Sequence, residues 1–187
     1  MISRMTACQT RSGPPHPQRV WRVFYTRPRA EFQCESRVRN REIETFVLKR
    51  DVLHQWKDRT KRVTEPVFSG YMFARVHERE RLDVLQTEGI VRCVSFGPAL
   101  AEVPEDEMER LQLAQLDPRR LALYELQLPN KGTRVVVTHG PMAGLTGDVL
   151  EHRGESYLVV RIDSIGRALR INIPAEWVRP VEPAELR

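Results

Sequence analysis

Three arginines and a tryptophan in the first third of the chain have side chains suited to binding phosphate and nucleic-acid bases. Arg27 and Arg29 flank Pro28 at the predicted start of a helix, and Arg37 follows about two turns later. Trp56 lies in a polar, basic segment. Guanidinium groups bind phosphate with a strong salt dependence, and an exposed indole can stack on an unpaired base. A solvated helix face and a tryptophan that covers a sheet edge fit the same residues, so both interpretations stay open.

The basic charge of the chain is concentrated around these residues. The whole chain of 187 residues holds 30 Lys and Arg against 25 Asp and Glu, a mild net charge of +5. Residues 19–62 alone hold 13 Lys and Arg against 6 Asp and Glu. The local excess is larger than that of the whole chain, which predicts a basic surface on this part of the fold and an acidic partner.

A second set of candidate residues consists of three aromatic side chains, Phe68, Tyr71 and Phe73. Alternate residues of a strand share a face, so Tyr71 and Phe73 are expected to point to the same side of a sheet. Aromatic side chains bury large areas and dominate the energy of many interfaces. The spacing alone favours a place in the core of the sheet, and a docking surface is the alternative.

The glycine-rich stretch Gly132–Val149 forms the third set. Its glycines stand at positions 132, 140, 144 and 147, and valines stand at positions 135, 136 and 137. This pattern predicts a strand, a tight loop and a second strand. Residues 132–181 are nearly neutral, with 6 Arg and 5 Asp and Glu. We therefore expect protein contact through an exposed Met142 and an exposed Ile165 more than strong RNA binding.

Sequence motifs of catalysis and metal binding are not recognisable. The 5 histidines are scattered without metal-ligand spacing, and no glycine-rich loop of the P-loop or dinucleotide type occurs. The 3 cysteines have no CxxC spacing, which argues against a disulfide framework or a zinc site and indicates a reducing compartment. The sequence predicts a binding protein that is not an enzyme and needs no cofactor or metal.

The beginning of the chain is polar and rich in proline, without the apolar segment of a secretory signal. No apolar run approaches the ~20 residues that a membrane-spanning helix needs. We expect a cytoplasmic monomer that does not contact a membrane, with residues 1–18 forming a disordered tail.

The elements that must position these residues form two predicted domains. Residues 19–116 have the order β-α-β-β-α-β-α, which predicts an α+β domain with an antiparallel sheet flanked by helices. The strands are expected at 20–25, 43–49, 63–68, 70–76 and 90–96. The helices are expected at 29–41, 79–87 and 105–116. Residues 50–62 are predicted to be a long hairpin loop. Residues 117–130 are predicted to be a linker that contains at most a short strand or helix around 121–128.

Apolar residues at helical spacing predict the buried stripe of each helix. These residues are Ala30, Cys34 and Val38, then Leu82 and Leu85, then Met108, Leu111 and Leu116.

Residues 131–183 contain short strands separated by turn signals. The strands are expected at 134–138, 147–152, 156–162, 167–173 and 178–181. Five short strands in about fifty residues predict a small all-β barrel of the SH3-like kind.

Two parts of the chain resemble known families. The pattern of glycine, valine and proline in Gly132–Val149, centred on Gly140-Pro141-x-x-Gly144, resembles the KOW motif of transcription and ribosomal proteins. Trp21, the segment Tyr25–Glu31 and the segment Glu65–Phe73 are similar to the NusG N-terminal domain. This order of domains covers about residues 20–181. The segment His54–Arg59 resembles the loop of UpxY-type antiterminators, and Ser69 stands where the family usually has proline.

The resemblance implies a factor for transcription elongation and antitermination. Phe68, Tyr71 and Phe73 would dock on the clamp helices of RNA polymerase. Positions that match Arg27 and Arg37 would touch the non-template DNA strand, with Arg29 and Trp56 as further candidates for nucleic-acid binding.

The resemblance also assigns a partner to the KOW domain. Its loop would bind a ribosomal small-subunit protein, the termination factor Rho or nascent RNA, and the candidate residues are Gly140, Pro141, Met142, Gly144 and Ile165. The C-terminal domain of RfaH, a relative of this family, can fold as a helical hairpin, but the valines and hairpin glycines here predict a barrel. An RNA-binding, ribosome- or translation-associated KOW protein without a polymerase partner is the alternative function.

Overall fold

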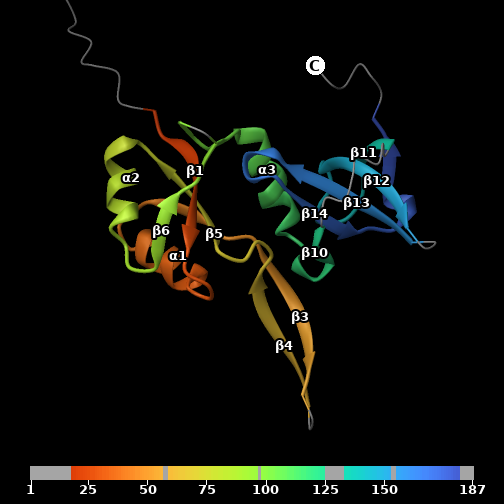
Figure 1. The fold of residues 1–187 in the computed structure, drawn as a ribbon. Helices are drawn as coiled ribbons and strands as arrows, with labels where there is room; N and C mark the ends of the chain where they lie inside the picture. Colours follow the sequence, from red (N-terminus) through yellow and green to blue (C-terminus); the bar gives the residue numbers. More distant parts are fainter. Residues whose placement is uncertain (1–17, 57–58, 97, 125–132, 153–154, 182–187) are drawn as a thin grey trace, which may run out of the picture.

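An α+β domain and a β domain lie side by side in the computed structural model of the protein, with a helix, α3, between them (Figure 1). The structure describes residues 18–56, 59–96, 98–124, 133–152 and 155–181. The predicted tail at 1–18 therefore lies outside the described residues except for Gln18. The predicted α+β fold class with a small β domain is confirmed.

The N-terminal domain is built on an antiparallel sheet with the order β2-β5-β1-β6, in which β9 also pairs with β1. The central strand β1 is rich in aromatic and β-branched residues, which fit a pleated surface buried on both sides. The strands are β1 Val20–Thr26, β2 Glu44–Phe46, β5 Tyr71–Val76, β6 Ile90–Cys93 and β9 Glu102–Val103. Two further short strands, β7 Ser95–Phe96 and β8 Ala99–Leu100, pair with each other.

One face of this sheet is covered by the helices α1 Glu31–Arg39 and α2 Glu78–Leu85. Phe24 and Met72 from the sheet form a buried cluster with Cys34 and Val38 from α1, as the predicted stripe requires. In α2 the predicted stripe is wrong for Leu82, which is 49% exposed, because Val84 faces the core instead.

The first helix begins later than its sequence predicts. Residues 28 and 29 form a turn in which Arg29 has a φ of 64°, outside the helical region, so the helix starts at Glu31 and not at 29. This turn is closed by the amide of Ala30, which donates to the carbonyl of Arg27 at 3.1 Å. Because of this turn, the backbone runs in different directions at Arg27 and at Arg29.

The other face of the sheet packs against α3 Glu105–Ala114. Met108 and Leu111 are buried there, as predicted. Leu116 is 58% exposed, so its predicted inward position is wrong. The helix ends at Ala114, which places Leu116 beyond the last turn.

The segment predicted as a long loop is a two-stranded ribbon. Strands β3 Lys49–Gln55 and β4 Thr60–Pro66 pair antiparallel over seven residues each, and the ribbon projects from the sheet (Figure 1). The strand predicted at 63–68 overlaps the second half of β4, while β3 and the first half of β4 lie in the predicted loop. These were missed because both faces of the ribbon are at least partly exposed. Neither strand therefore carries the apolar–polar alternation by which a half-buried strand is recognised.

The segment predicted as a linker is partly regular. A 3-10 helix at Pro118–Arg120 leads into β10 Leu121–Tyr124, which pairs with a strand of the C-terminal domain. Leu121 is buried in the joint core, and this gain in apolar contact accounts for the ordered structure there. Residues 125–132 lie outside the described residues.

The C-terminal domain is an antiparallel sheet with the order β10-β14-β13-β12-β11-β15. Its five predicted strands are confirmed with small shifts at their ends. The sixth strand, β10, lies in the segment that was predicted to be a linker. The strands are β11 Thr133–Val137, β12 Thr146–His152, β13 Glu155–Ile162, β14 Arg167–Asn172 and β15 Val178–Pro180. The domain is a β structure over its described residues, as predicted, and not a helical hairpin.

Candidate functional site

The aromatic face of the N-terminal sheet consists of Tyr25, Phe68, Tyr71 and Phe73. A turn positions two of these rings: the amide of Tyr71 donates to the carbonyl of Phe68 at 3.2 Å. Gly70 stands in this turn with a φ of +80°, which a residue with a side chain rarely adopts. The amide of Gly70 donates to the carboxylate of Glu31 at 2.7 Å, so the start of α1 holds the turn in place.

The two tyrosines of the aromatic face are in direct contact. Their hydroxyl groups lie 2.5 Å apart, and their ring centroids are 4.6 Å apart with a tilt of 43°. The hydrogen bond between the two hydroxyl groups and burial raise the pKa of the Tyr25 hydroxyl. The guanidinium of Arg92 lies 4.5 Å from the centroid of the Tyr25 ring. On the other side of the pair, the guanidinium of Arg167 lies 6.0 Å from the centroid of the Tyr71 ring.

Arg167 belongs to β14, so the contact with Tyr71 joins the two domains. Phe68, Tyr71 and Phe73 are 4%, 7% and 1% exposed and share one apolar cluster with residues of α3 and of the C-terminal domain, such as Leu169 and Ile171. Met72 lies between Tyr71 and Phe73 in sequence and belongs to the cluster of the opposite face. The prediction that Tyr71 and Phe73 share a face is confirmed. In this arrangement Phe68, Tyr71 and Phe73 are closed off from solvent, and Tyr25 is partly buried.

A polar contact of α3 also joins the two domains. Glu107 is 3% exposed, and its carboxylate accepts hydrogen bonds from the hydroxyl of Ser164 and, at 3.2 Å, from the amide of Asp163. Both partners belong to a 3-10 helix, Asp163–Ile165, of the C-terminal domain. Burial raises the pKa of the Glu107 carboxyl, while the hydrogen bonds from Ser164 oppose that shift. The sequence offered no signal for this contact, because its partners are 57 residues apart.

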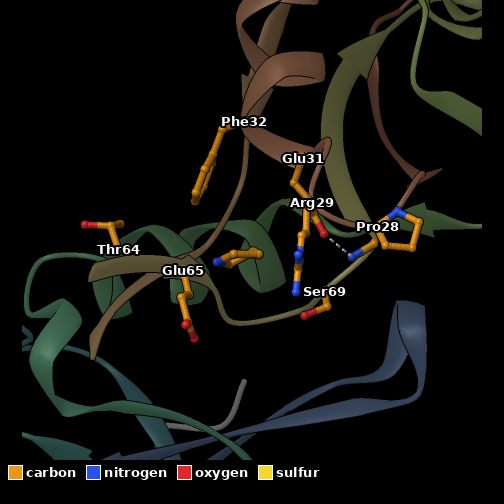
Figure 2. A pocket seen from close by; sticks show the side chains of 9 residues that line it. Pro28, Arg29, Glu31, Phe32, Thr64, Glu65 and Ser69 are labelled. Carbon is orange, nitrogen blue, oxygen red and sulfur yellow. Dashed lines mark hydrogen bonds between the residues drawn. The ribbon is translucent and has the colours of Figure 1, made fainter. Parts of the chain in front are cut away.

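The candidate arginines are divided between two places. Arg27 and Arg37 meet at the turn Glu88–Gly89: the amide of Arg27 donates to the carbonyl of Gly89, and the Arg37 guanidinium binds the carbonyl and carboxylate of Glu88 at 2.8 and 2.9 Å. Both arginines are exposed. Arg29 lies apart from them, in a pocket beside Ser69 (Figure 2).

Trp56 is separated from the arginines by the length of the ribbon. Its side chain is 64% exposed at the end of β3, and its amide donates to the carbonyl of Arg59 across the turn. Of the two open interpretations, cover of the sheet edge does not fit this position, because the residue stands at the far end of a projecting ribbon (Figure 1). A stacking role is compatible with its exposure.

The glycine-rich loop at 139–144 is exposed at Gly140, Pro141 and Gly144, but the predicted exposure of Met142 is wrong. Met142 is 1% exposed because the loop turns back on itself at Gly140 and Gly144, whose φ angles are +80° and +93°, and directs the methionine into the domain core. The predicted exposure of Ile165 is also wrong. Ile165 is 7% exposed and lies in the 3-10 helix that contacts α3.

The described residues contain no group of three or more His, Cys, Asp or Glu side chains that could hold a metal ion. In the same part of the chain, no helix has the length and apolar character that crossing a membrane requires.

The family model for NusG, described as transcription termination factor NusG, matches residues 19–112, which is half of the chain. The chain therefore belongs to the NusG family, whose members are transcription factors and not enzymes.

A solved structure shows the same fold. A structure described as "Domain interaction in Thermotoga maritima NusG" matches with a TM-score of 0.51 and 19% identity, over 88% of this chain and 98% of that one. The MjSpt4:Spt5 complex, in conformation B, is a weaker match, with a TM-score of 0.30 and 16% identity over 87% of this chain and 97% of that one. Curated proteins include no match to the chain.

Proposed function

We propose that the protein is a transcription elongation and antitermination factor that docks on the clamp helices of RNA polymerase through its aromatic face. Membership of the NusG family supports a role in transcription. One structural observation carries the choice of surface: the C-terminal domain, together with α3, covers the rings of the aromatic face, while α1 and α2 cover the opposite face. A face that is closed by a separate domain can be opened without unfolding the sheet.

Docking on polymerase then requires the C-terminal domain to leave Tyr71. The ring of Tyr71 faces Arg167 in the closed arrangement, so the same surface cannot also hold a polymerase helix. Binding to polymerase therefore competes with closing. The apparent affinity for polymerase is the intrinsic affinity multiplied by the fraction of molecules that are open. In the open state, the factor would hold the polymerase in a form that resists pausing or termination.

The exposed arginines are proposed to contact the non-template DNA strand. Arg27 has no hydrogen-bonding side-chain partner among the described residues, so its charge is available to phosphate. Arg37 is bound to Glu88, and a DNA phosphate would replace that carboxylate. Exposed ion pairs contribute little stability, so this exchange is inexpensive. Trp56 would stack on an unpaired base at the end of the ribbon.

The C-terminal domain is proposed to recruit a ribosomal small-subunit protein or the termination factor Rho. Gly140, Pro141 and Gly144 form an exposed loop, and the buried Met142 supports it from inside. Ile165 is buried in the closed arrangement, in the 3-10 helix whose neighbours Asp163 and Ser164 bind Glu107, so it would join the partner surface only if the domains separate. Attachment to a polymerase-bound domain raises the effective concentration of the C-terminal domain near such a partner.

Co-purification with RNA polymerase from cell extract tests the proposal. The double substitution Phe68→Ala, Tyr71→Ala is expected to abolish co-purification, while Tyr71→Phe keeps the ring and retains it. Met72→Ala is the matched control, because it truncates a buried neighbour that points to the opposite face. Circular dichroism establishes that each variant is folded. Unchanged polymerase binding by the double variant would refute the docking assignment.

The alternative function, an RNA-binding KOW protein without a polymerase partner, predicts salt-sensitive binding to structured RNA and no recovery of polymerase. The charges of the C-terminal domain do not favour it: Arg134 and Arg161 both lie within 4 Å of Asp148, at 3.5 and 3.8 Å. The same extract experiment separates the two functions.

A further inference from the structure

A pocket of about 590 Å³ lies between the start of α1 and the base of the β3–β4 ribbon. Figure 2 shows Arg29 and Phe32 from the helix side of this pocket and Thr64 and Glu65 from the ribbon side. Pro28 and Pro66 add apolar walls. The volume is within the usual range for pockets that bind small molecules or single side groups of larger ligands.

Arg29 is the cation of the pocket. Its left-handed backbone conformation, with a φ of 64°, ends the turn before α1, and its side chain extends toward Ser69 (Figure 2). Among the residues that the structure describes, none forms a hydrogen bond or an ion pair with the Arg29 guanidinium. An unpaired guanidinium is a good partner for phosphate, which it can bind through two parallel hydrogen bonds.

The two carboxylates that line the pocket each have hydrogen-bonding partners. The carboxylate of Glu65 is bound by His54 at 2.8 Å and by Arg50 at 3.4 Å, and the hydrogen bond from His54 is the main reason why the pKa of Glu65 lies below its usual value. The carboxylate of Glu31 accepts the amide of Gly70 and is 2% exposed. Arg29 is therefore the charged side chain of the pocket lining that has no hydrogen-bonding or ion-pair partner among the described residues.

Phe32 supplies a flat apolar surface beside that charge. Its side chain is half-buried, and the ammonium group of Lys49 lies 5.5 Å from the centroid of its ring. Phe32, Pro28 and Pro66 line the same pocket, so the ring offers an apolar face on which a nucleobase can stack. Base–aromatic stacking is tolerant of sequence because every base has a π face.

We propose that this pocket binds one unpaired nucleotide of a single-stranded nucleic acid, with the base on Phe32 and the adjoining phosphate on Arg29. This inference rests on the proposed contact with nucleic acid and adds Phe32 and a defined pocket to it. A base can stack on Phe32 only when it is unpaired, which excludes a regular duplex. Arg62, which shares a ribbon face with Thr64, extends the positive charge along the ribbon and gives the rest of the strand a path.

Fluorescence anisotropy of the full chain with a labelled 12-nucleotide single-stranded DNA tests the proposal. Phe32→Ala is expected to weaken binding about tenfold, and Phe32→Tyr is expected to restore it, because stacking needs the ring. Arg29→Gly is expected to weaken binding and to reduce the salt slope by about one. Glycine accepts the φ of 64°, so this variant removes the charge without straining the turn. Arg79→Ala removes an exposed arginine of α2 and is the matched control, with unchanged binding expected.

A second probe reports directly on stacking. A 2-aminopurine in the same oligonucleotide is expected to be quenched by the wild type and not by Phe32→Ala. The matching RNA oligonucleotide, run in parallel, shows whether the pocket distinguishes ribose from deoxyribose. Equal binding of the two oligonucleotides would confirm a site that accepts both single-stranded DNA and single-stranded RNA. Preference for RNA would identify the transcript as the ligand.

The outcomes separate this pocket from the wider proposal. If Arg27→Ala and Arg37→Ala weaken binding while Phe32→Ala and Arg29→Gly do not, the pocket assignment is refuted and the DNA contact stands. If the wild type does not bind single strands, both fail. If Phe32→Ala leaves DNA binding intact but reduces recovery of RNA polymerase, the pocket binds a protein segment and the proposal is refuted.

Discussion

The two faces of the N-terminal sheet are buried in different ways. Met72 and its neighbours are covered by α1 and α2. Each of these helices lies close in sequence to a strand of the sheet, since α1 follows β1 and α2 lies between β5 and β6. Tyr71 and its neighbours are covered by α3 and by a domain that begins more than 40 residues later in the chain. Burial of the first face is a condition of folding. Burial of the second depends on an interface between domains, which is where a binding surface can be kept closed until a partner competes for it.

Truncating each face separately gives the largest expected difference. Met72→Ala is expected to lower the free energy of unfolding by about 2–5 kcal/mol, because it leaves a cavity in a core that cannot open. Tyr71→Phe, which removes only the bond between the two hydroxyl groups, is expected to cost about 1 kcal/mol. Urea denaturation of the full chain measures both. Equal costs would show that the two faces do not differ as described.

Much of the fold could be predicted from the sequence, because its signals are local. The valine-rich and aromatic runs at 20–25, 70–76 and 134–138 are strands, and the stripe of Cys34 and Val38 faces the core. The β3–β4 ribbon could not be predicted in the same way. Its stability comes from backbone pairing and cross-strand contacts such as Val52 with Val63, which local periodicity does not report.

The candidate site could be predicted only in part for a related physical reason. Residue types suggested Tyr71 and Phe68, but not that a distant domain covers them. Arg167 and Glu107 acquire their roles from tertiary packing across 96 and 57 positions of sequence, respectively. Met142 and Ile165 were misplaced because an apolar residue in a short loop can point to either side, and only the turn geometry at Gly140 and the position of α3 decide which.

Removing the polar contact between the domains is expected to open the second face. Glu107→Ala leaves the Ser164 hydroxyl and the Asp163 amide without their partner, and an unsatisfied buried group costs about 1–3 kcal/mol. The ratio of closed to open molecules should fall by about 5- to 150-fold, and polymerase binding should become tighter.

Energy transfer between dyes on cysteines introduced at Gln33 and Glu176, which are exposed on the two domains, measures the opening. Cys8 is replaced by serine for this purpose, and Cys34 and Cys93 are buried. Glu109→Ala is the control, since Glu109 is exposed on the same helix. Opening by both variants would mean that the loss of any α3 carboxylate, and not the contact with Ser164, is responsible.

The closed arrangement is also expected to depend on pH. Burial raises the pKa of Glu107 in the closed state, so on raising the pH the open state releases its proton first. Closing is therefore most favourable at low pH, where both states are protonated. It weakens as pH rises from the ordinary carboxyl range through the raised pKa, and is constant above it. Arg110 limits this shift because its charge favours the carboxylate.

Energy transfer measured from pH 4 to pH 8 tests this dependence. Glu107→Gln, which keeps the shape without the titration, is expected to remove the change. Closing, and not global unfolding, is the quantity to measure, because Glu65 and Glu80 have lowered pKa values and affect unfolding with the opposite sign. A pH dependence that persists in Glu107→Gln would assign it to another group.

The smallest effect is expected at the contact of Arg167 with Tyr71. A guanidinium over an aromatic ring contributes about 0.5–1 kcal/mol at an exposed site, so Arg167→Ala should open the domains only about two- to fivefold. Arg170 on the same strand lies 5.0 Å from the centroid of the Tyr157 ring, within the C-terminal domain. Arg170→Ala therefore removes a contact of the same kind that does not cross between domains, and energy transfer should not change. If it did change as much as in Arg167→Ala, the effect would come from general weakening of the C-terminal domain, and the cover over Tyr71 would not depend on this arginine.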